Sequence, residues 1–196
     1  MTFFTQISTA QDSIIEPPAA QVLIEQLNMQ YLPIESGYFA LREGSNNSVA
    51  TDIVKESVDE ENVSRAIHSS IYYLLTASKP TNYLHWLDSD DVHILVDGGP
   101  LDYYLFLENG EVKHFRLGNN LAAGEHFAIT VPARSYKAIR LAKGATHGLM
   151  VNVLTPAWSE NGVRMGADKT FFEKYIGKAE WATSEFLESL IPPEGH

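Results

Sequence analysis

The chain has 196 residues, of which 44% are hydrophobic and 20% are charged, a composition typical of a soluble globular protein with one domain. The net charge of −11 makes the surface repel phosphate backbones, so we expect no nucleic-acid partner. The absence of cysteine excludes disulfide bonds, zinc–thiolate sites and thiol nucleophiles, and it fits a cytoplasmic location. No apolar run approaches the roughly 20 residues of a membrane span, so we expect no membrane partner.

The predicted elements begin with an N-terminal arm, residues 1–20, that has no clear period and ends in prolines. Apolar residues then recur at helical spacing over 19–29, which predicts a short amphipathic helix. Two further helical patterns lie near the C-terminal end, at 169–176 and 182–190. Between them, short runs bounded by turn residues predict strands over 38–42, 50–55, 66–75, 92–96, 101–107, 112–117, 127–131, 136–141 and 149–154. Many short strands at close spacing indicate an antiparallel sandwich or barrel.

The stretch 83–106 carries the most informative pattern, because two alternating runs flank the turn at residues 97–100. Side chains two apart on a strand share a face, so Asp91 and His93 lie together and the aliphatic residues between them point the other way. We expect the polar face to line a cavity and the aliphatic face to pack on a second layer. The Gly-Gly-Pro turn predicts that the stretch forms a hairpin.

Several short motifs occur in the order and spacing of one known family. They are ESGYF at 35–39, SIYYLL at 70–75, His85 with Ser-Asp-Asp at 89–91, Gly-Pro-Leu at 99–101 and Val-Pro-Ala at 131–133. From about residue 23 to residue 174, the chain resembles the cupin-5 (DUF985) cupins. The resemblance implies an all-β, RmlC-like cupin double-stranded β-helix, or jelly roll, with short flanking α-helices at both ends. It also implies a homodimer, whereas the activity of the family is mostly unassigned.

Under this resemblance, residues 21–167 form the cupin domain and residues 168–196 form a C-terminal helical tail packed on the barrel. His85 matches a histidine of the first cupin motif, and Asp91 lies where cupins have glutamate. The histidine of the second motif falls on Lys137. The chain departs from its own group at His93 and Tyr136, where tryptophan is usual, so the pocket chemistry is expected to be specialised.

The leading hypothesis is metal-independent acid–base chemistry with His85, Asp91, His93 and Lys137 as catalytic residues. A carboxylate beside a histidine fixes its tautomer and gives a general base or acid near neutral pH, and Asp91 could pair with either histidine. Lys137 or Tyr136 would then stabilise an enolate or donate a second proton. This set suits an isomerase, epimerase or lyase acting on a carbonyl-bearing, sugar- or polyketide-like small molecule.

Two alternatives remain open at this point. A metal-dependent oxygenase or lyase would use His85, Asp91 and His93 as ligands, but an ammonium at Lys137 would repel the cation, so we expect no metal and no other cofactor. The second alternative is a cupin whose pocket binds a ligand without catalysing a reaction. Five aromatic residues are the candidates for binding the substrate: Tyr38, Phe39, Tyr73, Tyr136 and Trp158.

Overall fold

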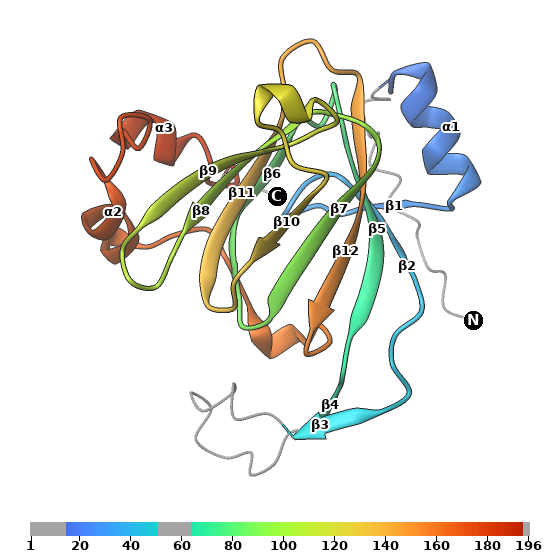
Figure 1. Cartoon of the computed structure of the whole chain (residues 1–196), viewed down its shortest axis with the longest axis horizontal. Coiled ribbons are helices and arrows are strands. Elements are labelled where there is room, and N and C mark those ends of the chain that lie inside the picture. Colours follow the sequence, from blue (N-terminus) through green and yellow to red (C-terminus); the bar gives the residue numbers. More distant parts are fainter. Residues whose placement is uncertain (1–14, 51–63, 194–196) are drawn as a thin grey trace, which may run out of the picture.

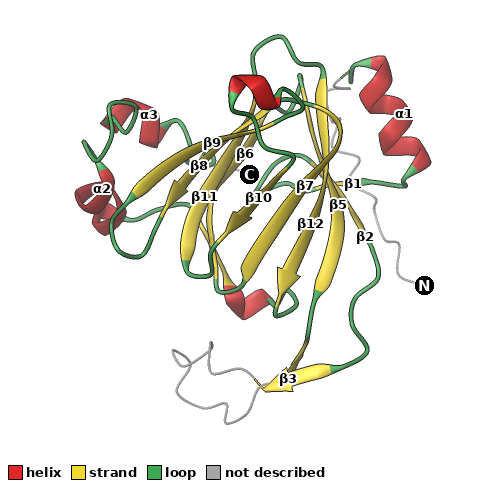
Figure 2. Ribbon diagram, viewed as in Figure 1, coloured by secondary structure: helices red, strands yellow, loops and turns green. Residues whose placement is uncertain are grey.

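The computed structural model describes residues 15–50 and 64–193. Most of the expected N-terminal arm and most of the expected strand over 50–55 lie outside these ranges. Within them, the chain forms two large antiparallel sheets that face each other, with helices on their outer sides (Figures 1 and 2). None of the helices in this part of the chain is long and apolar enough to cross a membrane.

The first sheet has six strands in the order β1-β2-β5-β12-β7-β10. Their bounds are Gln30–Tyr31 (β1), Tyr38–Leu41 (β2), Ser69–Thr76 (β5), His147–Thr155 (β12), Asp90–Gly98 (β7) and Ala128–Val131 (β10). The second sheet has five strands in the order β13-β6-β11-β8-β9. Their bounds are Val163–Met165 (β13), Thr81–Leu87 (β6), Ser135–Leu141 (β11), Leu101–Phe106 (β8) and Val112–Leu117 (β9). A separate two-stranded arm pairs β3 (Ser48–Ala50) with β4 (Ser64–Ala66).

The main core fills one end of the space between the sheets. Inward positions alternate along each strand, so both sheets contribute apolar side chains to one layer. Its buried members are Tyr73, Leu75, Leu101, Tyr103, Leu105, Leu117, Ile129, Val131, Ile139, Leu141 and Met150. This packing leaves the other end of the barrel for the site described below.

Helices cover the outer face of each sheet. On the six-stranded sheet, α1 (Pro18–Gln26) lies over a small cluster around Leu74 and Leu149. On the five-stranded sheet, α2 (Lys169–Tyr175) and α3 (Ser184–Glu188) bury an aromatic cluster that includes Phe106. Two 3-10 turns, Leu121–Ala123 and Glu160–Gly162, complete the described helices. The fold is therefore all-β with short helices at its two ends, as the sequence predicts.

Two expectations about the stretch 83–106 are wrong. The turn at 97–100 does not close a hairpin, because β7 pairs with β12 and β10 whereas β8 pairs with β11 and β9, so the chain crosses between the sheets there. The aliphatic face of β7 does not pack on a second layer either. Ile94 and Val96 are 42% and 52% exposed, while the polar face of the strand turns into the barrel.

Strand β6 was missed by the sequence pattern, although it carries His85. The strand contains no polar–apolar alternation, because both of its faces are covered. Leu84 packs under the C-terminal helices, and His85 and Leu87 face the barrel interior. A short apolar run buried on both sides gives no period from which a strand can be recognised.

Candidate functional site

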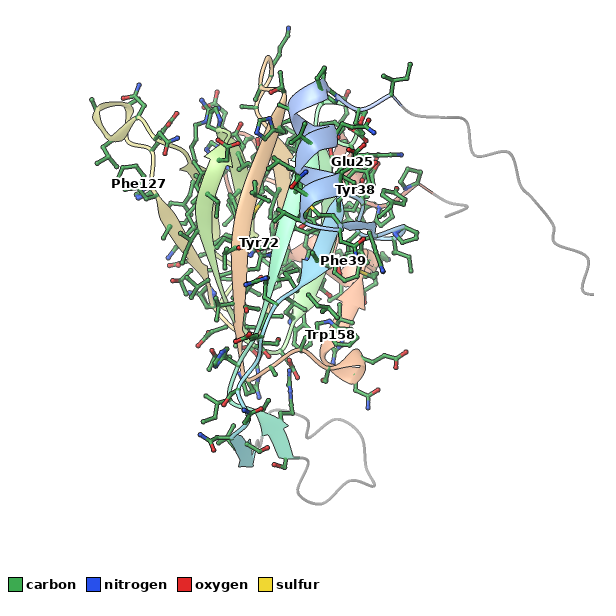
Figure 3. The ribbon with its side chains drawn as sticks, turned by 90° about the vertical axis from the view of Figure 1, so that its right-hand side faces the viewer. Glu25, Tyr38, Phe39, Tyr72, Phe127 and Trp158 are labelled. Atoms are coloured by element: carbon green, nitrogen blue, oxygen red, sulfur yellow. The ribbon has the colours of Figure 1, made fainter. Side chains whose placement is uncertain are left out.

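A pocket of about 420 Å³ opens at the end of the barrel opposite the main core. Its walls come from both sheets and from the loops after β1 and β12. Figure 3 labels two of the wall residues, Phe39 and Trp158. The lining consists of Leu32, Glu35, Phe39, Leu41, Ser69, Ser70, Ile71, His85, Leu87, Asp91, Lys137, Asn152, Leu154 and Trp158.

Strand register explains why these residues meet. Paired positions on antiparallel strands share a face, so one inward residue carries its partners inward with it. On the five-stranded sheet, Lys137 of β11 pairs with His85 of β6. On the six-stranded sheet, Asn152 of β12 pairs with His93 of β7 and with Ile71 of β5. Two facing rows of side chains therefore project toward one another across the barrel.

Lys137, Asp91 and His93 form a buried polar cluster between these rows. The Lys137 ammonium donates to Asp91 Oδ2 and lies 3.0 Å from His93 Nε2. Burial alone would raise the pKa of Asp91, but His93 and Lys137 outweigh it and hold this pKa well below its usual range. Asp91 is therefore ionised, and its charge is matched inside the barrel by that of Lys137.

His93 uses both of its ring nitrogens in this cluster. Its Nε2 lies 2.6 Å from Asp91 Oδ2, a distance that requires a proton between them, so Nε2–H donates to the carboxylate. Its Nδ1 then accepts from the hydroxyl of Tyr103 at 2.9 Å. Burial lowers the pKa of His93 to about 4 although Asp91 opposes the shift, so the ring is neutral near pH 7. His93 does not itself line the pocket, and it positions Asp91 from behind.

His85 is set differently. Its Nδ1–H donates to the carbonyl oxygen of Tyr83 at 2.7 Å, which leaves the lone pair on Nε2. Glu35 Oε2 lies 3.7 Å from this nitrogen, beyond hydrogen-bond distance. Burial lowers the pKa of His85 against the opposing effect of Glu35, and Lys137 adds to the lowering. The ring is thus a neutral base whose free nitrogen belongs to the pocket.

Among residues 15–50 and 64–193, two buried acceptor atoms in the pocket have no hydrogen-bond partner. They are Asp91 Oδ1 and Asn152 Oδ1, and both residues line the cavity. A buried polar atom without a partner costs roughly 1–3 kcal/mol, which is the usual mark of a position that a ligand or water fills. The pocket thus offers unsatisfied oxygen atoms beside a neutral base.

The residues do not fit the metal that the cupin resemblance implies. A cupin metal needs three or four nitrogen or oxygen ligands that converge on one point. Among the described residues, no group of three or more histidine, aspartate or glutamate side chains is arranged to hold an ion. The ammonium of Lys137 already contacts Asp91 and His93, the two residues that a metal would need.

The predicted substrate-binding residues divide into two groups. Phe39 and Trp158 line the pocket. Tyr38 points to the outer face beside α1, where its hydroxyl donates to Glu16 Oε1 at 2.6 Å (Figure 3). The Tyr38 side chain is therefore not part of the pocket, because its strand turns the neighbouring Phe39 inward instead.

The other two tyrosines also lie outside the pocket. Tyr73 faces inward, but it belongs to the main core, and its hydroxyl donates to the carbonyl oxygen of Ser36. Tyr136 lies on the outer face of β11 with its ring centroid 5.1 Å from that of Phe171. It is adjacent to Lys137 in sequence and therefore on the opposite face, so the two cannot share the site.

Glu35 and Asn152 are two polar pocket residues that sequence reasoning missed. Glu35 stood in the first of the motifs that carry the family resemblance, but no role followed from its position in a loop. Asn152 is the lone polar residue in the apolar run 149–154. A polar side chain at an inward strand position was the available signal for it.

Comparison with known proteins defines the class. The structure superposes on a hypothetical protein from Leishmania major with a TM-score of 0.74, at 20% identity over 88% of this chain and 98% of that one. Protein SO0799 from Shewanella oneidensis gives a TM-score of 0.70, at 22% identity over 89% and 98% of the two chains. At these identities the likeness concerns the fold alone.

The sequence places the chain within this class. A family profile described as Cupin superfamily (DUF985) matches residues 21–166, and the chain belongs to that family. It is also 32% identical over 130 residues to the uncharacterized protein YML079W of Saccharomyces cerevisiae. That alignment covers 63% of this chain and 62% of the yeast protein, so it spans less than two thirds of the relative's length.

Proposed function

We propose that this protein is a metal-independent, small-molecule enzyme of the isomerase, epimerase or lyase type that uses acid–base chemistry in the barrel pocket. The observation that carries the proposal is the tautomer of His85, a residue that lines the pocket: Nδ1–H donates to the carbonyl oxygen of Tyr83, so the lone pair of the neutral ring is on Nε2, and burial lowers the pKa of the ring. A neutral imidazole fixed in this way is the base that proton abstraction at neutral pH requires.

In the proposed step, His85 Nε2 removes a proton from the carbon beside a carbonyl group of the substrate. The C–H bonding electrons move to the carbonyl oxygen and form an enolate, which the Lys137 ammonium stabilises. The new imidazolium faces the Glu35 carboxylate, whose negative charge favours it. Return of the proton to carbon gives isomerisation or epimerisation, and loss of a group from the next carbon gives elimination. No oxidant or reductant is needed.

Solvent exchange tests this step even when the product has not been identified. A panel of ketones and sugars in deuterium oxide is followed by proton NMR for loss of the signal beside the carbonyl. The wild-type protein is expected to accelerate exchange in at least one compound, and His85→Gln is expected to lose about 100-fold or more of that rate. His126→Gln replaces an exposed histidine and is the matched control. Equal rates in wild type and His85→Gln would remove His85 from the chemistry.

Metal content separates this proposal from a metal-dependent oxygenase or lyase. The protein is grown with iron, manganese, nickel and zinc supplied and is analysed after purification. We expect no stoichiometric metal, because Lys137 contacts both Asp91 and His93. Metal bound at one equivalent and lost in His85→Ala would replace the proposed mechanism. Binding of a small molecule without any exchange would instead indicate a non-catalytic ligand-binding cupin.

We also infer a cytoplasmic location, which the absence of cysteine fits, and a homodimer, as the family resemblance implies. The exposed Ile94 and Val96 lie on the outer face of β7, where a second copy would cover them. Light scattering after gel filtration is expected to give the mass of two chains. A monomer at micromolar concentration would contradict the assembly and would leave the proposed chemistry untouched.

A further inference from the structure

The pocket mouth exposes apolar surface that core packing does not use. Leu41 is 78% exposed and Trp158 is 54% exposed, although both line the pocket. Deeper in, the walls continue with Phe39, Ile71 and Leu154. Because exposed apolar area beside a cavity is a mark of ligand contact, these walls are suited to the apolar body of a bound molecule.

The position of Trp158 is fixed by contacts around it. Its backbone N–H donates to Ser69 Oγ at 2.9 Å. The carbonyl oxygen of the preceding residue, Ala157, accepts from Arg65 Nε at 2.7 Å, and Arg65 is itself paired with Asp88. The backbone of Trp158 is therefore held at the mouth, which keeps the indole within reach of a bound ligand.

The charges at the head of the pocket select against ionic ligands. The charges of Asp91 and Lys137 offset each other and Glu35 adds a negative charge, so the head of the pocket repels an anion, whereas a cation at Asp91 Oδ1 would lie close to the ammonium of Lys137. A neutral group avoids both penalties. A hydroxyl donates to Asp91 Oδ1 and satisfies the buried oxygen that has no partner, and a neighbouring carbonyl group accepts from Lys137.

We infer that the ligand is a neutral hydroxycarbonyl compound with an apolar body, and neither a sugar nor a phosphorylated or carboxylated metabolite. This inference rests on the proposed function, because the carbonyl group that Lys137 polarises is the one whose neighbouring carbon His85 deprotonates. The head lies among Asp91, Lys137 and His85, and the body lies along Phe39 toward Trp158. Of the two substrate classes expected from the sequence, this favours the polyketide-like one.

A series of matched probes tests each part of the inference by isothermal titration calorimetry. Phenacyl alcohol has the neutral hydroxyketone head and an aromatic body. Acetophenone lacks the hydroxyl, benzoylformate carries a carboxylate, phenethylamine carries an ammonium, and dihydroxyacetone has the head without the apolar body. Phenacyl alcohol is expected to bind most tightly, and loss of its hydroxyl is expected to weaken binding about 10-fold because Asp91 Oδ1 is again left unpaired.

Two variants locate the binding. Trp158→Ala is expected to weaken phenacyl alcohol binding about 10-fold, because part of the apolar wall is removed. Phe127→Ala replaces an aromatic residue of similar exposure, 51%, that does not line the pocket, and it is expected to bind the probe as the wild type does. Equal weakening by both variants would mean that the probe binds elsewhere, and it would overturn the inference.

The order of affinities decides the outcome. Tighter binding of benzoylformate, phenethylamine or dihydroxyacetone than of phenacyl alcohol would overturn the inference, and so would no binding of any probe at 10-millimolar concentration, roughly the limit of a weak specific site. Failure of the proposed function looks different. In that case phenacyl alcohol binds in the expected order, but its hydrogens beside the carbonyl do not exchange faster with the wild type than with His85→Gln.

Discussion

Two buried histidines of this barrel, His85 and His93, differ in what their ring nitrogens do. His93 donates to Asp91 and accepts from Tyr103, so neither nitrogen is free. His85 uses only Nδ1, toward Tyr83, and keeps its Nε2 for the pocket. Burial lowers the pKa of both rings, so a shifted pKa does not distinguish them. The unused nitrogen does, and for this reason we propose His85 as the base and His93 as a positioning residue.

The largest effect on stability is expected when the buried polar cluster of Lys137, Asp91 and His93 is broken. Lys137→Met leaves the Asp91 carboxylate buried without its cation, which is expected to lower the free energy of unfolding by about 3–5 kcal/mol. The measurement is urea denaturation at pH 7. The double variant Lys137→Met/Asp91→Asn is expected to recover much of this loss, because the unpaired charge is gone. A loss below about 1 kcal/mol in the single variant would contradict a buried ion pair.

The next prediction concerns stability at acid pH, which depends on the pKa of His93. Its folded-state pKa of about 4 lies below the ordinary 6.5, so the unfolded chain binds more protons between these pH values. Stability is therefore lost as pH falls from 6.5 to 4, by up to about 3 kcal/mol from this residue. The free energy of unfolding of the wild type and of His93→Phe is measured across this pH range. It is expected to depend less steeply on pH in the variant. His85 shifts in the same direction and remains in both proteins.

The last prediction needs no change to the protein, because the tautomers of His85 and His93 can be measured directly. Long-range nitrogen–proton NMR of the unmodified protein at pH 7 is expected to show His85 protonated at Nδ1 and His93 protonated at Nε2. No substitution is needed, so folding defects cannot obscure the result. The same tautomer at both histidines would erase the distinction between them. Protonation of His85 at Nε2 would remove its role as a base.

The fold was accessible from the sequence because it rests on ordered motifs and on turn residues. The hairpin at Asn109-Gly110, for example, joins β8 and β9, and Gly110 takes the left-handed conformation that glycine favours. The site was only partly accessible. His85, Asp91 and Lys137 were predicted and do meet in the pocket. Their pairing was not predictable, because whether Asp91 serves His85 or His93 depends on which strands face each other across the barrel.

The missed features depend on tertiary packing, which no local sequence pattern records. Glu35 reaches the pocket from a loop whose path is set by tertiary contacts, and β6 has no alternation because both of its faces are buried. Tyr136 and Lys137 were both assigned to the site, although neighbours on a strand point to opposite sheet faces. The register of β11 against β6 decides which of them is inside, and it selects Lys137.

The strand that carries His85 depends on parts of the chain far downstream. Leu84 N donates to the carbonyl oxygen of Leu190, and Leu84 O accepts from Gly166 N, both at 2.8 Å. Met165 of β13 pairs directly with His85. These contacts form only after residue 190 has been synthesised. A chain truncated within α3 would therefore lack part of the backbone hydrogen bonding of the strand that carries the proposed base.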